Sequence, residues 1–284
     1  MKVIRAEVLG FCMGVRRAVD AAEKALSESD GSPCFTLGPL IHNPTVMASF
    51  AERGMGILDS SPESDFPDGT RVVIRAHGTT PDVLRNLQER NASVIDATCP
   101  KVHLSQRRVR EWSERGYSVI IAGDRNHGEV TSISSYCVPG ARVTVVQNSD
   151  EASKLELDGK SVLIAQTTFS PTEYEKIINI VTEKCPETEV FHSICSATMK
   201  RQEALLALEG KVDGILVIGG KNSANTRRLY ESALKISGKV ALIEDETEIP
   251  EEFYGLSCVG LSAGASTPDS VIDAVESRLM KGRN

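Results

Sequence analysis

The chain has 284 residues, a formal net charge of −7 and 25% charged residues, and its length suits two or three small domains with their own cores. It has no apolar run long enough to cross a bilayer and no signal-peptide pattern before its first strand, so we expect a soluble cytoplasmic protein. The negative charge argues against general nucleic-acid binding, which usually needs a basic face, but leaves room for a pocket that binds a small anion.

Six strand-like runs follow one another along the chain, and each ends in a small polar cluster. They cover residues 34–43, 71–80, 117–129, 160–170, 213–225 and 256–266. Amphipathic helical patterns lie between them, for example at 44–54, 81–91, 171–184 and 268–282. This alternation predicts an α/β fold with mainly parallel sheets, whose ligands lie beyond the carboxyl ends of the strands.

Three cysteines share one sequence context, with a strand-like segment before them and a helix directly after. Cys12 lies in "VIRAEVLGFCMGVRRAVDAAEKAL", Cys99 in "NASVIDATCPKVHLSQRRVREW" and Cys195 in "TEVFHSICSATMKRQEALLALEG". Their separations of 87 and 96 residues predict an internal repeat. We therefore expect three small α/β modules in a pseudo-threefold arrangement, each contributing one cysteine and two loops to a shared centre.

The repeat also predicts where the modules begin and end. We expect module 1 at 13–97, module 2 at 98–194 and module 3 at 195–284. The N-terminal strand and the first cysteine loop, residues 1–12, are expected to pack with module 3. No linker-like stretch separates the modules, so they should pack tightly.

Four of the predicted helices start with a proline that follows a polar residue. These prolines are Pro44, Pro81, Pro171 and Pro268, preceded by Asn43, Thr80, Ser170 and Thr267. Proline suits the first helical position, and the N–H groups of helix N-termini attract phosphate. The sequence has no GxxxxGK[ST] motif and no GxGxxG after a strand, so an anion would be bound in some way other than ordinary nucleotide binding.

Seven cysteines in an intracellular chain are not expected to form a disulfide framework. The repeated three fit either a metal site or buried packing positions. Structural zinc sites take four ligands, commonly in CxxC pairs that this sequence lacks. A 4Fe–4S cluster can instead take three thiolates from distant segments and leave one iron open as a Lewis acid. The other cysteines, Cys34, Cys137, Cys185 and Cys258, are expected to pack in the core.

Nine motifs resemble, in order, those of the 4-hydroxy-3-methylbut-2-enyl diphosphate reductase family, also called IspH or LytB. They are "GFCMGV", "HNP", "RAHG", "DATCPKV", "HGEV", "AQTT", "ICSATMKRQ", "GGKNSAN" and "SAGAST", and they span Cys12 to Pro268. The resemblance implies three α/β modules around a central 4Fe–4S cluster, which air exposure would degrade to a 3Fe–4S form. It also implies the last step of the deoxyxylulose phosphate (MEP) route of isoprene biosynthesis.

The implied reaction is the reductive removal of a hydroxyl from an allylic diphosphate, which gives isopentenyl and dimethylallyl diphosphates. The electrons would come from a ferredoxin or flavodoxin type of donor. By motif position, Cys12, Cys99 and Cys195 match the cluster ligands. In the mechanism that the resemblance implies, the open iron binds the substrate hydroxyl and a raised pKa lets a glutamate protonate it.

The remaining motif residues also carry over by position. Glu129 matches the proton source, His127 its substrate-facing neighbour, and Thr168 a hydroxyl that relays protons and orients the substrate. The implied substrate-binding residues are His42, His77, His127, Thr168, Ser223, Ala224, Asn225 and Ser266. Without the resemblance, these would be interpreted as hydrogen-bonded histidines, a solvated glutamate and helix-capping residues. His103 and His192 fall outside the motifs and are expected to be structural.

The chain departs from the family pattern at three positions. Ala224 stands where a second serine is common, so a backbone N–H would replace one diphosphate hydroxyl. Ser196 replaces a usual tyrosine after the third cysteine, and Gly128 stands where proline is common. None of these changes removes an expected cluster ligand or Glu129.

Two other functions remain open from the residues. One is a lyase of the quinolinate synthase type, which would share three modules and a three-cysteine cluster but act on a dicarboxylate. The other is an iron–sulfur sensor without turnover, which has little use for a glutamate beside an open iron. Turnover of the allylic diphosphate with a reduced viologen dye would separate all three.

Overall fold

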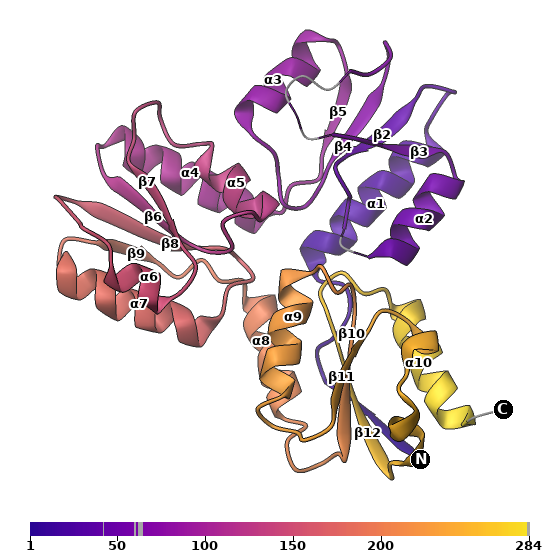
Figure 1. Cartoon of the computed structure of the whole chain (residues 1–284). Helices are drawn as coiled ribbons and strands as arrows, with labels where there is room; N and C mark the ends of the chain where they lie inside the picture. Colours follow the sequence, from indigo (N-terminus) through magenta and orange to yellow (C-terminus); the bar gives the residue numbers. More distant parts are fainter. Residues whose placement is uncertain (42, 60, 62–64, 283–284) are drawn as a thin grey trace. The chain divides into compact units, whose positions relative to one another are not determined.

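The computed structural model describes residues 1–41, 43–59, 61 and 65–282, and contains three sheets of four strands each (Figure 1). Every strand pairing in these sheets is parallel, which confirms the predicted α/β class. The strands are β1 (Lys2–Arg5), β2 (Cys34–Leu37), β3 (Met55–Leu58), β4 (Arg71–Ile74), β5 (Ser93–Asp96), β6 (Ser118–Ala122), β7 (Val143–Val146), β8 (Ser161–Ala165), β9 (Glu189–Phe191), β10 (Gly214–Ile218), β11 (Val240–Ile243) and β12 (Cys258–Ala263).

Helices alternate with the strands along the chain, as the sequence pattern predicted. The α-helices are α1 (Met13–Ser27), α2 (Pro44–Glu52), α3 (Pro81–Glu89), α4 (Pro100–Glu114), α5 (Gly128–Ser134), α6 (Ser149–Ser153), α7 (Pro171–Lys184), α8 (Ser196–Leu206), α9 (Ala224–Ala233) and α10 (Asp269–Lys281), with short 3₁₀ helices η1 (Glu246–Glu248) and η2 (Glu251–Gly255). Among the described residues, no helix is both long and apolar enough to cross a membrane.

The chain divides into two compact units. Unit 1 comprises Met1–Arg16, Ile41–Ser49 and Ser196–Asn284, and unit 2 comprises Arg17–Leu40 and Phe50–Cys195. Unit 1 therefore contains one of the three sheets and unit 2 contains the other two. The finer module boundaries at 13–97, 98–194 and 195–284 stay a prediction.

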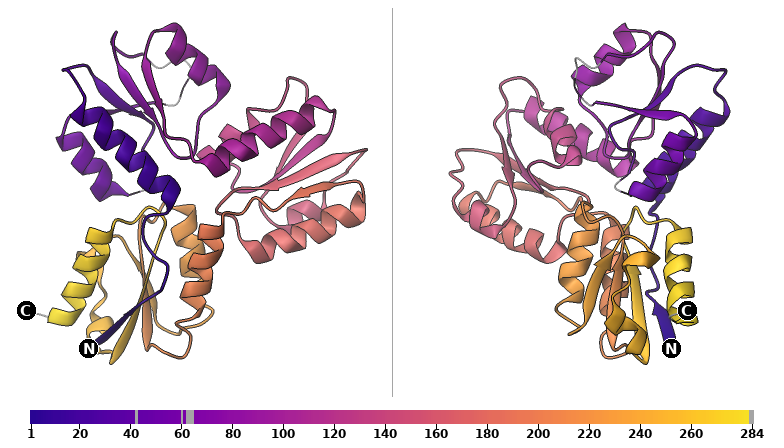
Figure 2. Two further views of the ribbon diagram at one scale, coloured as in Figure 1. Left: turned by 180° about the vertical axis from the view of Figure 1, so that it is seen from behind. Right: turned by 45° about the vertical axis from the view of Figure 1, so that its right-hand side comes forward.

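The sheet of unit 1 is covered by helices on both faces (Figure 2). Leu216 and Ile218 of β10 point to one face, where they pack in a cluster with α10. Ile215 and Val217 alternate with them and pack on the other face with α8 and α9. A parallel strand buried on both faces is expected to be continuously apolar, and "GILVI" of β10 meets that requirement.

The two sheets of unit 2 are built in the same way. In the sheet of β6 to β9, Ile120 and Leu163 pack against α6 and α7, whereas Ile121 and Ile164 pack against α4 and α5. In the sheet of β2 to β5, one face packs against Val83 of α3. These covered faces direct ligand access to the carboxyl ends of the strands.

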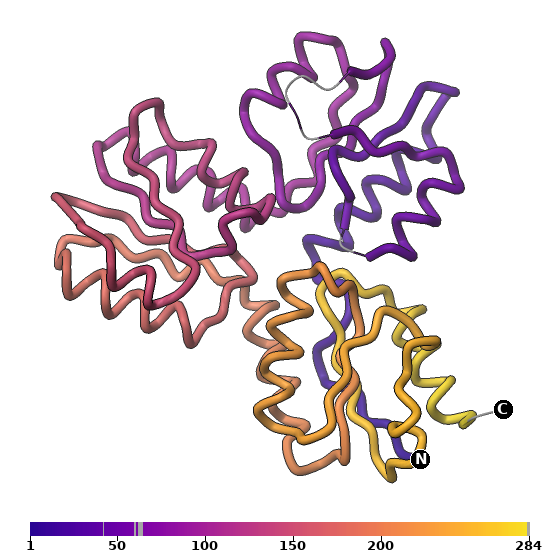
Figure 3. The backbone as a smooth tube through the Cα atoms, in the orientation of Figure 1, coloured from indigo at the N-terminus to yellow at the C-terminus, as the bar shows by residue number. Residues whose placement is uncertain are grey.

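All three sheets repeat one strand order. The orders are β3-β2-β4-β5, β7-β6-β8-β9 and β11-β10-β12-β1, so each module places its second strand at one edge and its fourth at the other. In the last sheet the N-terminal strand β1 takes the place of the fourth strand and pairs in register with β12, Lys2 opposite Cys258 (Figure 3). The internal repeat predicted from the cysteine spacing is therefore a repeat of topology.

The proline pattern locates helix starts with one exception. Pro44, Pro81 and Pro171 are the first residues of α2, α3 and α7. Pro268 instead precedes α10, which begins at Asp269. Thr267 does not cap the helix, because its hydroxyl donates to the carbonyl oxygen of Ile218 (2.9 Å), 49 residues earlier in the sequence.

Three of the four cysteines outside the repeated context lie in or against the core, whereas Cys258, the first residue of β12, is partly exposed. Cys34 and Cys185 are buried, and Cys185 donates through its Sγ to the Gly159 carbonyl oxygen (3.1 Å). Cys137 packs against the cluster beneath α4 and α5, and burial raises the pKa of its thiol to about 11 although Ser113 opposes the shift. A thiol with such a pKa stays protonated near neutrality and is a poor metal ligand or nucleophile.

Alkylation should distinguish Cys137 from an ordinary thiol. Its pKa of about 11, against the usual 9.0, leaves about a hundredfold less thiolate at pH 8, so iodoacetamide should label it correspondingly slowly. The rate should rise as the pH approaches the raised pKa. Timed labelling of native protein, read by mass spectrometry against the same protein in denaturant, measures this. Equal Cys137 labelling in both samples would contradict the buried environment.

Candidate functional site

Each of the three repeated cysteines occupies the same position in its sheet. Each follows the strand at one edge, and its backbone N–H donates to a carbonyl in the loop after the neighbouring strand. The bonds run from Cys12 to Ala265 (3.1 Å), from Cys99 to Ala76 (3.0 Å) and from Cys195 to Thr167 (2.9 Å). None of the three forms a disulfide bond in the part of the chain that the structure describes, and all three are partly buried.

A helix begins directly after each of these cysteines: α1, α4 and α8 start at Met13, Pro100 and Ser196. The Sγ of Cys12 accepts a hydrogen bond from the Val15 N–H (3.4 Å). Positions at helix N-termini stabilise thiolates, the form in which cysteine binds metals. The donor set therefore fits a thiolate-bound cluster.

The structure does not itself assemble the three thiols. Among the residues that it describes, no three His, Cys, Asp or Glu side chains gather into a group that could hold a metal ion. Cys12 belongs to unit 1, whereas Cys99 and Cys195 belong to unit 2. Their role as cluster ligands stays a prediction.

The loop that carries Cys12 is fixed by a buried arginine. Arg201 of α8 is 2% exposed and donates to the carbonyl oxygens of Gly10 (2.7 Å) and Ala197 (3.0 Å). Gly10 has φ of +76°, and a Cβ there would lie 3.1 Å from a carboxylate oxygen of Asp269. Glycine is thus required both by the backbone conformation and by the space.

Glu129 is a buried carboxylate with two hydrogen bonds from Thr167. It is 1% exposed, and its two oxygens accept from the Thr167 N–H (2.6 Å) and the Thr167 hydroxyl (2.9 Å). The carbonyl oxygen of the same Thr167 accepts from the Cys195 N–H. Thr167 therefore connects the predicted proton source directly to a predicted cluster ligand.

The two predicted histidines of unit 2 lie together. The rings of His77 and His127 are edge to face, with centroids 4.8 Å apart. The Nδ1 of His127 caps α5 by accepting from the Glu129 N–H (3.1 Å). Because an N–H can only donate, a neutral His127 ring with this contact carries its proton on Nε2.

Thr168 and Thr167 make different contacts. The Thr168 hydroxyl accepts from the Gln166 side-chain amide (3.0 Å), and the side-chain oxygen Oε1 of Gln166 accepts from the Asp124 N–H (2.9 Å). Gln166 is fully buried. The relay role predicted for Thr168 is not tested by this geometry, but the hydroxyl that reaches Glu129 is that of Thr167.

Ser223, Asn225 and Ser266 form the predicted diphosphate set of unit 1. Each is 6% exposed; Ser223 caps α9 by accepting from the Thr226 N–H (3.4 Å). The Nδ2 of Asn225 is buried and has no hydrogen-bond partner among the described residues. A buried amide donor without an acceptor is costly, so it is a position where a ligand oxygen would be favourable.

Two glycines bring the loops of this set close together. A Cβ on Gly264, after β12, would lie 2.2 Å from the Thr226 hydroxyl of α9. Gly219, after β10, has φ of +144° and a Cβ there would lie 2.9 Å from the same oxygen. Any larger residue would separate the loop of Ser266 from the start of α9.

The other predicted positions are placed as follows. His42 lies outside the described residues. Ala224 is the buried first residue of α9, and Gly128 is the first residue of α5.

The two histidines assigned to structural roles differ in their surroundings. His103 contacts Asp96 (3.2 Å) and Gln106 (2.9 Å), as a structural histidine would. His192 is exposed.

Three residues that contact this site were not singled out from the sequence: Thr167, Gln166 and Arg75. The first two belong to the motif "AQTT", but nothing in the pattern distinguishes Thr167 from Thr168. Arg75 stands in "RAHG", where an arginine after a strand would ordinarily be expected to be solvated. Only the contacts with residues far away in the sequence identify them.

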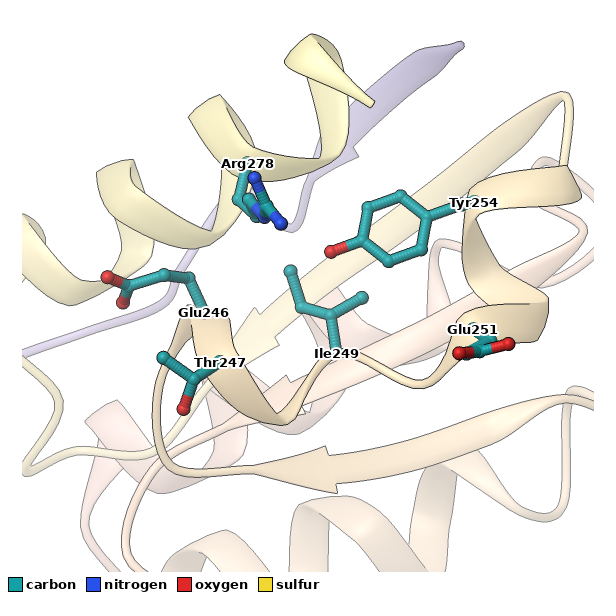
Figure 4. Close-up of a pocket in the computed structure, with 6 residues that line it drawn as sticks. All are labelled: Glu246, Thr247, Ile249, Glu251, Tyr254 and Arg278. Atoms are coloured by element: carbon teal, nitrogen blue, oxygen red, sulfur yellow. The ribbon is translucent and has the colours of Figure 1, made fainter. Parts of the chain in front are cut away.

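Unit 1 also contains a cavity of about 690 Å³ away from these residues (Figure 4). Its lining consists of Glu246, Thr247, Ile249, Glu251, Tyr254 and Arg278. None of these was predicted as a site residue, and they carry no chemistry of the predicted reaction.

Comparison with known proteins identifies the family. The family model described as LytB protein matches residues 3–280. The 4-hydroxy-3-methylbut-2-enyl diphosphate reductase of Treponema denticola is 45% identical, over 99% of this chain and 100% of its own length.

Two solved structures share the fold. One is the E-1-hydroxy-2-methyl-but-2-enyl-4-diphosphate reductase from Plasmodium falciparum, with TM-score 0.88, 27% identity and coverage of 96% of this chain and 86% of that one. The other, an (E)-4-hydroxy-3-methyl-but-2-enyl diphosphate reductase described as the terminal enzyme of the non-mevalonate pathway, has TM-score 0.71 and 38% identity, with coverage of 99% and 100%. With a family match over nearly its whole length, the chain belongs to the LytB protein family.

Proposed function

We propose that the chain is an iron–sulfur reductase that converts 4-hydroxy-3-methylbut-2-enyl diphosphate to isopentenyl and dimethylallyl diphosphates. Family membership supports the reaction and substrate. The observation that carries the proposal is Thr167, which bonds both to the buried carboxylate of Glu129 and to the backbone of Cys195. An enzyme that couples proton delivery to a thiolate-bound cluster needs these two groups in fixed relation.

The reaction consumes two electrons and two protons, since the allylic C–O bond breaks, the oxygen leaves as water and the carbon skeleton gains a hydrogen. When bound by Cys12, Cys99 and Cys195, a 4Fe–4S cluster would supply the electrons and a Lewis-acidic iron. A ferredoxin or flavodoxin type of protein would reduce it. The chain's own residues would bind the diphosphate, orient the hydroxyl and deliver a proton to its oxygen.

Glu129 is the proton donor in this proposal. Its burial excludes bulk water from the carboxyl group, and the two bonds from Thr167 hold it in one orientation. These bonds are available to the carboxylate as soon as its proton has left, so they stabilise the product of the transfer. A fixed acid beside the departing hydroxyl lowers the barrier more than a freely rotating one.

Diphosphate binding is assigned to donors of both units, which serve the same reaction. In unit 1 they are the Asn225 amide, whose Nδ2 has no partner among the described residues, and the Ser223 and Ser266 hydroxyls. In unit 2 they are His77 and the Nε2–H of His127. His42 keeps this role from the sequence resemblance alone.

Anaerobic turnover tests the proposal directly. Purified protein with reduced methyl viologen should consume the allylic diphosphate and release both isopentenyl and dimethylallyl diphosphates. Inability to turn over this substrate, or consumption of a dicarboxylate in its place, would contradict the proposal and favour the sensor or the lyase.

Replacing Glu129 should separate chemistry from binding. Glu129→Gln keeps the size and can still accept from the Thr167 N–H, but cannot give up a proton, so kcat should fall at least about a hundredfold with little change in KM. Glu111→Gln, an exposed helix residue paired with Arg115, is the matched control and should retain full activity. A Glu129→Gln enzyme with near-normal kcat would move the proton donor elsewhere.

Replacing Asn225 should weaken binding. Because its amide would donate to a charged oxygen, Asn225→Ala should raise the apparent KM about tenfold or more, while the cluster absorption stays unchanged. Asn179→Ala, at an exposed position of α7, should have no effect. Kinetics with the diphosphate substrate measure both, and an unchanged KM in Asn225→Ala would remove this residue from the site.

A further inference from the structure

Arg75 is a cation that the reaction as proposed does not use. It directly follows β4, in the same loop as His77. Its guanidinium lies over Gly128, the first residue of α5: a Cβ added to Gly128 would be 2.6 Å from Nη2 and 3.1 Å from Cζ. Glycine at 128 therefore leaves the space that the guanidinium fills, next to His127 and Glu129.

This charge has no counter-charge in the described part of unit 2. The Nε of Arg75 is shielded from solvent and has no hydrogen-bond partner among the described residues. Burial alone lowers the pKa of its guanidinium, with no compensating effect of a nearby carboxylate. A desolvated cation without a neighbouring anion is unfavourable, so Arg75 at this position lowers the free energy of unfolding.

The groups around Arg75 favour an anion of high charge. His127 directly precedes Gly128 and His77 follows Arg75 by two residues, and the two imidazole rings lie edge to face with centroids 4.8 Å apart. Guanidinium groups bind phosphate through two parallel N–H bonds and keep their charge when partly buried.

We propose that Arg75 binds a phosphate oxygen of the diphosphate ligand and supplies the counter-charge for it in unit 2. The inference rests on the proposed function for the identity of the ligand. Gly128 has a matching role, because it holds open the position that the guanidinium needs. Proline, the residue that the family resemblance leads one to expect at 128, would compete for that space.

Inorganic diphosphate is the probe for this assignment. Isothermal titration of the anaerobically purified, cluster-containing protein should show binding that weakens about tenfold or more in Arg75→Gln and less in Arg75→Lys, which keeps the charge. Gly128→Ala should also weaken binding, since its methyl group displaces the guanidinium. Arg85→Gln is the matched control, because Arg85 is an exposed arginine of α3 paired with Asp82, and it should bind as wild type does. Unchanged binding in Arg75→Gln, or no binding to wild type, would overturn the assignment.

Thermal unfolding without ligand separates binding from a structural role. Arg75→Met keeps the aliphatic stem and removes the desolvated charge, so its Tm should equal or exceed that of wild type, while the rise in Tm on adding diphosphate should shrink. A Tm lowered by several degrees would show that Arg75 supports the fold, and would also overturn the proposal. The two proposals can fail separately. If the wild type binds diphosphate and Arg75→Gln does not, but the wild type fails to turn over the allylic substrate, the proposed reaction is wrong and the anion site stands.

Discussion

The hydrogen bond from each cysteine N–H to the loop of the neighbouring strand is the constraint on which the rest of this structure depends. It appears once in each sheet, at 2.9–3.1 Å, and fixes each thiol beyond the carboxyl end of its edge strand. The bond exists because all three sheets share one strand order, including the sheet in which β1 replaces a fourth strand. A topological repeat thereby yields one thiol at an equivalent position of each sheet.

The chemistry of the site is added by loops that differ between the sheets. In the sheet of β6 to β9, the carbonyl that receives the cysteine N–H belongs to Thr167, whose other polar groups hold Glu129. In the sheet of unit 1, the equivalent carbonyl belongs to Ala265, next to Ser266, and glycines allow the start of α9 to approach. The same backbone arrangement thus carries a buried acid, Glu129, in one sheet and a buried serine, Ser266, in another, as expected when loops on a repeated scaffold differ in their chemistry.

Much of this fold could be predicted from the sequence because its signals are local. Continuous apolar runs such as "GILVI" identify buried parallel strands, and proline after a polar residue locates the starts of α2, α3 and α7. Pro268 precedes its helix and does not start it, because the preceding Thr267 donates to Ile218, a residue far away in the sequence.

The side-chain contacts of the candidate site were not predictable from the sequence for the same reason. The bond from the Thr167 hydroxyl to Glu129 and the packing of Arg75 over Gly128 both depend on contacts between distant segments, which no local pattern encodes.

The central claim is that the three repeated cysteines, and no others, hold one cluster. Iron and inorganic sulfide content of anaerobically purified protein tests it most directly, with Cys12→Ser, Cys99→Ser and Cys195→Ser compared with Cys258→Ser. The account predicts about four irons and four sulfides per chain in wild type and Cys258→Ser, with a sharp loss in each of the other three variants. Full cluster content in any one of those three, or zinc in place of iron in the wild type, would contradict it.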